Sequence, residues 1–357
     1  MTASPRIDLT GLGWDAAWAA QVAPFAGTPG RVARVDRGVC TVLAETGPVR
    51  AGLGADLLAA VARDSTNAPC TGDWVAVREW PDGRATVDAV LPRRTSFVRA
   101  EASERSRGQV LAANMTVVAV VAGLDALPVL TRIERLLALA WASGADPAVL
   151  LTKADRAADA EDVASDVRKN APGVQVICCS AVTGQGLIAL EELIGSSGTV
   201  ALLGSSGTGK SSLTNALAGA EVLSTQAIRA DGRGRHTSVR RELVLLPGGG
   251  AVIDTPGLRG VGLVDAGQGL AATFADIAEL AADCRFSDCG HESEPGCAVL
   301  EAVDGGLLAQ RRLLSWRKLC REQAWIAARS DERLRGQQVK VAKLRTRSAR
   351  QAAQRRS

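Results

Sequence analysis

The hydrophobic positions fall into two patterns along the chain. In the N-terminal part, short valine-rich runs alternate with turn residues such as glycine and aspartate. Five of these runs are expected strands, at residues 30–38, 39–45, 47–52, 72–79 and 83–91. Short strands at such close spacing are typical of a small barrel, either an OB-fold or an SH3-like barrel. We therefore predict a β-barrel over residues 30–97, preceded by an N-terminal arm over residues 1–29.

The second pattern begins near residue 115, where the apolar runs become continuous. These runs lie at residues 115–123, 147–151, 174–179, 199–203 and 251–254. Uninterrupted apolar runs are typical of parallel strands that are buried on both faces. Segments of helical length separate them, such as 131–144 and 161–170. The alternation predicts a doubly wound α/β domain over residues 108–265.

The C-terminal part differs from both. A cysteine cluster is followed by residues 306–334, in which basic and apolar residues interleave as they do in a helix. We predict a mostly helical domain over residues 270–330. Residues 331–357 are rich in Arg, Gln and Ala and have little apolar surface to bury, so we expect a basic, flexible tail.

Composition narrows the class of protein. Hydrophobic residues make up 46% and charged residues 22% of the chain, which is ordinary for a globular protein. No apolar run approaches the roughly 20 residues that cross a bilayer, and the N-terminus lacks a basic start followed by an apolar stretch. Eight cysteines in a chain of this length, without a secretory signal, do not indicate a disulfide framework. We expect a cytoplasmic protein with no membrane partner.

The net charge of +4 is unevenly distributed. Residues 331–357 contain nine Lys or Arg and two acidic residues, a local charge of +7, so the rest of the chain carries −3. A basic tail on a slightly acidic body indicates an acidic polymer as partner. A solvated end that binds nothing specific explains the composition equally well.

The strongest chemical signal is the sequence GSSGTGKS at residues 204–211, which fits the phosphate-loop pattern GxxxxGK[ST]. It lies between an expected strand and an expected helix, which a chance glycine-rich turn would lack. Glycines let backbone N–H groups wrap the phosphates, Lys210 reaches the β- and γ-phosphates, and Ser211 ligates Mg²⁺. The candidate nucleotide-binding residues are Gly204, Ser205, Ser206, Gly207, Thr208, Gly209, Lys210, Ser211 and Ser212.

Two further segments fit the magnesium and γ-phosphate side of such a site. Asp254 ends an expected strand and begins the sequence DTPG; such an Asp holds the Mg²⁺ shell, and the N–H of Gly257 senses the γ-phosphate. Upstream, the sequence IRADGRGRHTS carries His236 and Thr237. The Thr237 hydroxyl is a candidate to complete the magnesium shell when GTP is bound. Taken alone, DTPG is also an ordinary turn and IRADGRGRHTS a flexible connection.

Base identity comes from the sequence TKAD, Thr152 to Asp155, which resembles the [NT]KxD motif of GTPases. The Asp155 carboxylate would accept hydrogen bonds from guanine N1–H and the 2-amino group, which adenine cannot donate. The stem of Lys153 would lie along the purine face. Ser180 and Ala181 resemble the short loop that contacts guanine O6. Either segment alone is weak, but both follow expected parallel strands and, with the phosphate loop, favour a GTPase over a generic ATPase.

The order of these motifs is unusual. Ordinary GTPases run from the phosphate loop through the switches to the base-reading motifs, whereas this chain places 152–155 and 180–181 before the phosphate loop. The same fold can form, because its strands are visited from a different starting point. As a further result of this order, the second switch, just after Gly257, continues directly along the chain into the C-terminal segment. We infer, as a hypothesis, that nucleotide state is transmitted to that segment covalently.

The C-terminal segment carries a candidate metal site. Cys284, Cys289, His291 and Cys297 have the spacing C-x4-C-x-H-x5-C. Three thiolates and one imidazole form a closed tetrahedral set that suits one structural Zn²⁺ rather than a catalytic metal. The alternative is a set of reduced cysteines that bind no metal.

Motif order together with cysteine spacing resembles the RsgA family of circularly permuted, ribosome small subunit-dependent GTPases. The resemblance covers nearly the whole chain, including GDWVAV and LPRRTSFVRA in the barrel segment. It implies an N-terminal OB-fold, a central permuted P-loop GTPase domain with GTP or GDP and Mg²⁺, and a C-terminal zinc domain. It also implies late maturation of the small ribosomal subunit, whose rRNA would be the partner and whose binding would stimulate hydrolysis. We expect a monomer.

The chain departs from related patterns at three positions. Leu258 follows DTPG where many GTPases carry a water-orienting Gln, so the water must be positioned otherwise. The resemblance makes His236 a candidate for this role, and a contact with RNA is an equal alternative. Gly207 lies where potassium-activated GTPases carry Asn, so we expect no dependence on potassium through this position. Ser238 replaces the more usual Thr, which leaves open whether Thr237 or Ser238 ligates Mg²⁺.

The candidate residues for catalysis are Lys210, His236, Thr237 and Asp254. Two other functions fit the same residues. The chain can be a nucleotide-gated rRNA-binding module in which hydrolysis is incidental, or a GTPase that serves another ribonucleoprotein.

Overall fold

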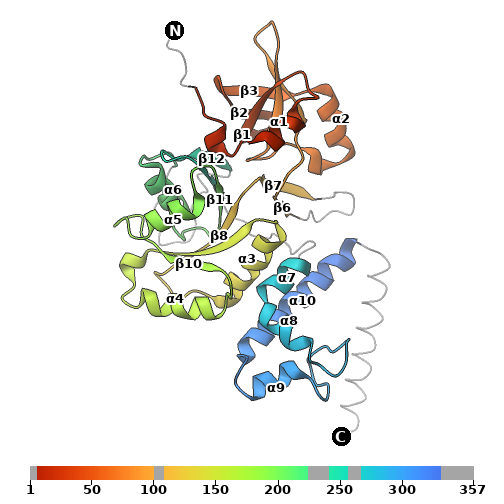
Figure 1. Cartoon of the computed structure of the whole chain (residues 1–357), viewed down its shortest axis with the longest axis vertical. Helices are drawn as coiled ribbons and strands as arrows, with labels where there is room; N and C mark the ends of the chain where they lie inside the picture. Colours follow the sequence, from red (N-terminus) through yellow and green to blue (C-terminus); the bar gives the residue numbers. More distant parts are fainter. Residues whose placement is uncertain (1–5, 100–107, 224–240, 256–266, 331–357) are drawn as a thin grey trace.

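The structure, a computed structural model, describes residues 6–99, 108–223, 241–255 and 267–330. It consists of a β-barrel, a central sheet covered by helices and a C-terminal group of helices, arranged in that order along the long axis (Figure 1). Among the described residues, no helix is both long and apolar enough to span a membrane.

The barrel is closed by five strands in the order β1-β2-β3-β5-β4. These strands are β1 (Thr28–Asp36), β2 (Val39–Ala44), β3 (Gly47–Leu53), β4 (Trp74–Glu79) and β5 (Ala85–Val90). Neighbours are antiparallel except β3 and β5, which are parallel. The valines and alanines of the alternating pattern point inward and fill the barrel. The predicted OB-like barrel is confirmed, while the helix α2 (Ala55–Arg63), inserted between β3 and β4, was not predicted.

The N-terminal residues fold onto the outside of this barrel. A short 3₁₀ turn, η1 (Thr10–Leu12), precedes the helix α1 (Ala16–Val22). Asp15 caps α1 by accepting a hydrogen bond from the Trp18 N–H at 3.0 Å. The Trp18 ring is almost fully buried beside Trp74 of β4. The arm therefore adds to the apolar core of the barrel region.

The central sheet has six strands in the order β10-β9-β8-β11-β13-β12. They are β8 (Val117–Gly123), β9 (Asp146–Thr152), β10 (Gln175–Cys178), β11 (Thr199–Leu203), β12 (Glu242–Leu245) and β13 (Ala251–Asp254). All neighbours are parallel except β12, an antiparallel edge strand that the sequence pattern did not reveal.

Helices cover both faces of the sheet, as the predicted doubly wound fold requires. They are α3 (Leu130–Ala142), α4 (Ala160–Lys169), α5 (Leu187–Ile194) and α6 (Lys210–Ala218). Because successive side chains of a strand point to opposite faces, each strand contributes side chains to the apolar layer on either face of the sheet. Val149 packs with residues of α3 and α4, whereas Leu150 packs with residues of α5 and α6. The predicted α/β domain is confirmed.

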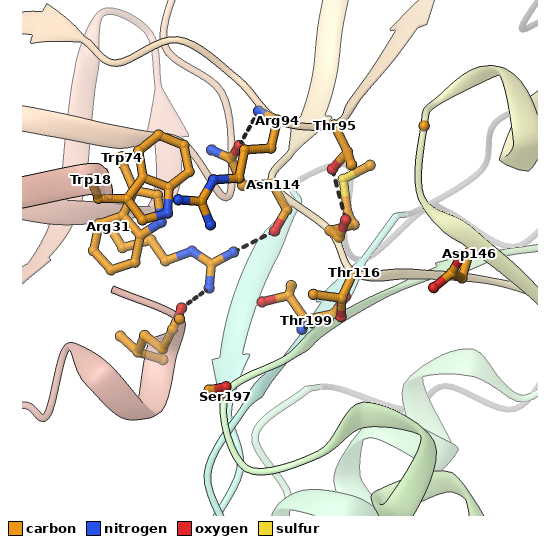
Figure 2. Close-up of a pocket in the computed structure, with 14 residues that line it drawn as sticks. Trp18, Arg31, Trp74, Arg94, Thr95, Asn114, Thr116, Asp146, Ser197 and Thr199 are labelled. Atoms are coloured by element: carbon orange, nitrogen blue, oxygen red, sulfur yellow. Dashed lines mark hydrogen bonds between the residues drawn. The ribbon is translucent and has the colours of Figure 1, made fainter. Parts of the chain in front are cut away.

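A two-stranded sheet, β6 (Ser96–Arg99) with β7 (Gln109–Ala113), lies between the barrel and the central sheet. Beside it the two parts line an open-sided pocket of about 270 Å³ (Figure 2). The buried guanidinium of Arg31 reaches three backbone carbonyls there, those of Leu12, Gly72 and Asn114. One side chain thus joins the arm, the barrel and the start of the central domain.

The C-terminal unit is helical, as predicted. Its helices are α7 (Gly267–Thr273), α8 (Ala275–Ala281), α9 (Ala298–Asp304) and α10 (Gln310–Ser330). Helix α7 packs against α3, and α10 contacts both α3 and α7 (Figure 1). Phe274, which is fully buried, links this core to the central domain.

Candidate nucleotide site and metal centre

The motif residues gather at the carboxyl edge of the central sheet. Strands β8, β9, β10, β11 and β13 run parallel, so the loops that follow them emerge at the same edge. The crevice at this edge is where ligands of open α/β sheets bind. Segments that the sequence separates by up to a hundred residues are therefore neighbours.

The phosphate loop runs from the end of β11 into the first turn of α6, which begins at Lys210. A side chain is excluded at Gly204, because a Cβ there would lie 2.5 Å from the Val121 carbonyl oxygen. Gly209 has φ 91°, in the left-handed region that favours glycine. The loop thus opens directly onto a helix N-terminus, the arrangement that binds phosphate.

Lys210 is buried in this loop, with 7% of its surface exposed. Its Nζ donates hydrogen bonds to the carbonyl oxygens of Gly204, at 3.0 Å, and Ser205, at 2.8 Å. Burial lowers the pKa of the Lys210 ammonium, and the nearby Asp254 opposes this shift. The ammonium is held inside the loop with one donor left to reach an anion.

Asp254 and Ser211 meet at the end of β13. The Ser211 hydroxyl donates to Asp254 Oδ2 at 3.0 Å. Asp254 is 4% exposed, and its Oδ1 is buried without a hydrogen-bond partner among the described residues. Burial raises the pKa of the Asp254 carboxyl, while Lys210 and Ser211 lower it. A buried carboxylate oxygen without a donor, beside a hydroxyl, fits a divalent cation with oxygen ligands.

The base-reading loop is hydrogen-bonded to the phosphate loop. Thr152 Oγ1 donates to the Thr208 carbonyl oxygen at 2.5 Å, across 56 residues of sequence. A Cβ added to Gly209 would lie 3.4 Å from the same Oγ1, so the two loops approach closely at this point. Lys153, next in the chain, has φ 59°, an uncommon conformation for a residue other than glycine.

The second base-reading loop contacts the first. The Ser180 hydroxyl donates to Asp155 Oδ1 at 2.5 Å and accepts the N–H groups of Val182 and Thr183. The Ala154 N–H donates to the Cys179 carbonyl oxygen at 3.2 Å. Ala181 lies half-buried between these contacts. The structure therefore brings Asp155, the Ser180–Ala181 loop and the phosphate loop together.

The remaining candidates are placed as follows. Ser206 is exposed at the tip of the phosphate loop, and Ser212 is exposed on α6. His236, Thr237, Ser238, Gly257 and Leu258 lie outside the described residues.

Sequence reasoning missed two charged residues near these loops. Asp125, in the loop after β8, forms an ion pair with Lys153 at 2.6 Å. Arg132, in the first turn of α3, donates to Ser205 Oγ at 3.1 Å. Both come from the segment after β8, a strand that lies between β9 and β11 in the sheet. No sequence motif marks the two residues; the strand order, which the structure provides, places this segment at the same edge as the motifs.

The C-terminal unit brings together the candidate metal ligands. One ligand atom each from Cys284, Cys289, His291 and Cys297 lies within 4.8 Å of all the others. His291 Nδ1 is 3.3 Å from Cys297 Sγ and 3.6 Å from Cys284 Sγ, and these two sulfurs are 3.8 Å apart. A tetrahedral zinc with Zn–S of about 2.3 Å requires sulfurs about 3.8 Å apart, so the set fits this metal.

Comparisons with known proteins agree with this geometry. The family model described as RsgA GTPase matches residues 90–264. The small ribosomal subunit biogenesis GTPase RsgA of Streptomyces coelicolor is 53% identical, over 92% of this chain and 90% of its own length. The protein of that name from Opitutus terrae is 44% identical, over 90% and 92%.

Solved structures share the fold. The crystal structure of YjeQ from Thermotoga maritima has 25% identity and a TM-score of 0.61, covering 82% of this chain and 96% of its own. YloQ, described as a circularly permuted GTPase, has 23% identity and a TM-score of 0.56, covering 83% and 94%.

Proposed function

This chain belongs to the RsgA GTPase family, and from that premise we propose that residues 152–155, 180–181, 204–212 and Asp254 form one pocket in which GTP binds and is hydrolysed. Family membership makes the chain a guanine-nucleotide enzyme of small ribosomal subunit biogenesis. The predicted family, enzyme class and function are thereby confirmed. The observation that supports the shared pocket is the hydrogen bond from Thr152 to the phosphate loop.

Guanine recognition is assigned to the two base-reading loops. The Asp155 carboxylate accepts the N1–H and 2-amino hydrogens of guanine, and the Ser180 hydroxyl fixes its orientation. The backbone N–H of Ala181 would face the base O6, and the Lys153 stem would cover the purine face. A carboxylate held in this way rejects adenine, which would leave it unpaired.

The phosphates are assigned to the loop and to α6. Loop N–H groups and Lys210 neutralise the charge that develops on the transferred phosphoryl group. Ser211 and Thr237 would hold Mg²⁺ directly and Asp254 through water, and the bound ion would supply positive charge at the phosphates. Gly257 would report the γ-phosphate through its N–H. His236 would either position the attacking water or hold its loop on RNA.

One structural Zn²⁺ is assigned to Cys284, Cys289, His291 and Cys297. All four ligand atoms converge, so no position is left open for a substrate. The His291 ring also lies against Trp316 of α10, tilted by 53° with 5.3 Å between ring centroids. The metal would hold the loop between α8 and α9 on that helix.

The proposed partner is the small ribosomal subunit, with its rRNA as the contacted polymer. The protein would act as a monomer in the cytoplasm, late in maturation, and the subunit would stimulate slow intrinsic hydrolysis. The basic residues of 331–357 would strengthen RNA binding in a salt-dependent way. Hydrolysis would then release the protein from the subunit.

The experiment compares GTP and ATP turnover by the purified protein alone, with small subunits and with large subunits. We expect slow GTP turnover that rises with small subunits only, and no ATP turnover. ATP hydrolysis at a similar rate would contradict the assigned pocket. Equal stimulation by large subunits would contradict the assigned partner. It would favour the alternative that the GTPase serves another ribonucleoprotein.

A further inference from the structure

A carboxylate stands between the two halves of the proposed nucleotide site. Asp125 is the second residue after β8, and β8 lies between β9, which leads into the base-reading loop, and β11, which leads into the phosphate loop. The loop after β8 therefore emerges between the position proposed for the base and the position proposed for the phosphates, where the middle of a bound nucleotide would lie. No sequence motif marks Asp125.

Asp125 makes a close ion pair with the base-reading lysine. Lys153 Nζ donates to Asp125 Oδ2 at 2.6 Å, with side chains 23% and 44% exposed. This hydrogen bond lowers the pKa of the Asp125 carboxyl, and partial burial opposes the shift. The Arg156 guanidinium adds a weaker favourable field. The carboxylate is therefore ionised at neutral pH and able to hold the ammonium.

The Asp125–Lys153 pair lies next to Gly123, the last residue of β8. A Cβ on Gly123 would lie 2.6 Å from Asp125 Oδ1 and 3.6 Å from both Cδ and Nζ of Lys153. A side chain at position 123 would require the Asp125 carboxylate to move, whereas the Lys153 stem lies at ordinary contact distance. The pair thus lies against the end of β8, with the Lys153 side chain more buried than that of Asp125.

The lysine stem is fixed at three places. Its backbone has φ 59°, and the next residue, Ala154, donates its N–H to the Cys179 carbonyl oxygen. A Cβ on Gly209 would lie 4.0 Å from Lys153 Cε, so the stem passes beside the phosphate loop. The Asp125 carboxylate holds the far end. A long side chain that is free in solution is ordered here before any ligand arrives.

We propose that Asp125 is a positioning residue of the nucleotide site, which acts through Lys153 by holding its stem in the orientation that covers the purine face. This inference rests on the proposed function, because it takes residues 152–155 as the base-reading loop. Asp125 acts on the lysine of the base-reading loop, so it should contribute equally to the binding of GTP and of GDP. Its effect is on nucleotide affinity and not on the chemical step.

The test measures dissociation constants for fluorescent GDP and a non-hydrolysable GTP analogue, with KM and kcat for GTP. We expect Asp125→Asn to raise both dissociation constants and KM by about fivefold, the effect of a partly exposed pair, with kcat unchanged. Asp125→Glu should recover most of the affinity. Asp166→Asn is the matched control, because Asp166 pairs with Lys169 at 3.2 Å on the exposed face of α4.

A double-mutant cycle shows whether Asp125 acts through the lysine. In a Lys153→Met background, which keeps most of the stem and removes the ammonium, Asp125→Asn should change affinity by less than about twofold. Unchanged affinity of the single Asp125→Asn variant, or the same loss in both backgrounds, overturns the proposal. A fall in kcat at constant KM also overturns it. If the wild-type protein binds no guanine nucleotide, the proposed function itself fails, and the wild-type measurement shows this first.

Discussion

At the scale of single residues, the buried carboxylate of Asp254 opposes stability in the nucleotide-free protein. Its Oδ1 has no hydrogen-bond partner among the described residues, and only Ser211 donates to Oδ2. Leaving such a group buried costs about 1–3 kcal/mol. The arrangement is what a cation-binding position requires, since a carboxylate satisfied by protein donors would have less to offer a metal.

We therefore predict that Asp254→Asn stabilises the nucleotide-free protein at neutral pH by about 1 kcal/mol and abolishes GTP turnover. Urea unfolding at equilibrium measures the first effect and phosphate release the second. The exposed residue Asp166, changed to Asn, serves as control and should stay within about 0.5 kcal/mol of wild type. Loss of stability at neutral pH in Asp254→Asn would contradict this account of the site.

The same carboxyl predicts a pH dependence. Burial raises the pKa of Asp254, so the folded protein holds this proton more tightly than the unfolded chain does. The stabilisation from the protonated form is complete below the ordinary pKa and is lost as pH rises through the raised one. The difference in free energy of unfolding between Asp254→Asn and wild type should shrink as pH falls to about 4, close to the ordinary pKa. A pH-independent difference would show that the charge of Asp254 is not the cause.

At the scale of elements, helices α3 and α10 are joined by a buried ion network. Glu134 of α3, 1% exposed, accepts hydrogen bonds from Arg311, Arg312 and Ser315 of α10. Arg312, 3% exposed, also pairs with Asp276 of α8 at 2.5 Å. The network attaches the helical C-terminal unit to the helix whose first turn touches the phosphate loop.

Removing one member of a buried ion pair leaves the charge of the other member buried without a partner. We predict that Glu134→Ala lowers the free energy of unfolding by about 3 kcal/mol, measured by urea denaturation. The matched control is Glu161→Ala, which removes an ion pair with Arg168 in which the side chains are 75% and 45% exposed. That change should cost less than about 1 kcal/mol. Equal losses from both variants would mean that the network does not hold α10 on α3.

The sequence pattern predicted those elements whose burial repeats along the chain. The five barrel strands and the five parallel strands of the central sheet each leave a periodic or continuous apolar run, and all were found at their predicted positions. The antiparallel strand β12 and the strand β7 are short, and nothing local shows which neighbour completes them. Arg31 and Glu134 could not be singled out either, because their partners are far away in the sequence. Motif spacing found the phosphate and base loops, whereas Asp125 needed the strand order.

At the scale of the whole molecule, the proposed metal centre and the proposed nucleotide pocket belong to different units. Cys297→Ser should reduce the bound zinc, measured per mole of protein, and expose α9 and α10 to hydrogen exchange. Because the cluster lies outside the central domain, GDP affinity should stay within about twofold of wild type. Cys320→Ala, which changes a thiol outside the cluster, should retain the metal. Full zinc content in the Cys297→Ser variant would contradict the assigned ligand set.

The permuted order matters at this scale as well. The base-reading loops precede the phosphate loop in the chain, yet the sheet places all of them at one edge. The central claim is that this edge forms a single pocket, where Asp155 selects guanine while Lys210 contacts the phosphates. Any test of this claim must show that a change at the base end alters the binding of a whole nucleotide.

The most direct measurement is the affinity of wild-type protein and Asp155→Asn for GDP, ADP and xanthosine diphosphate. Xanthine carries a carbonyl where guanine carries the 2-amino group, so the side-chain amide introduced by the substitution can donate to it while the Asp155 carboxylate cannot. We predict that wild type binds GDP in preference to both others, and that the variant shifts by about a hundredfold or more toward xanthosine diphosphate. Retained preference for GDP in the variant, or equal binding of ADP and GDP by wild type, would contradict the account.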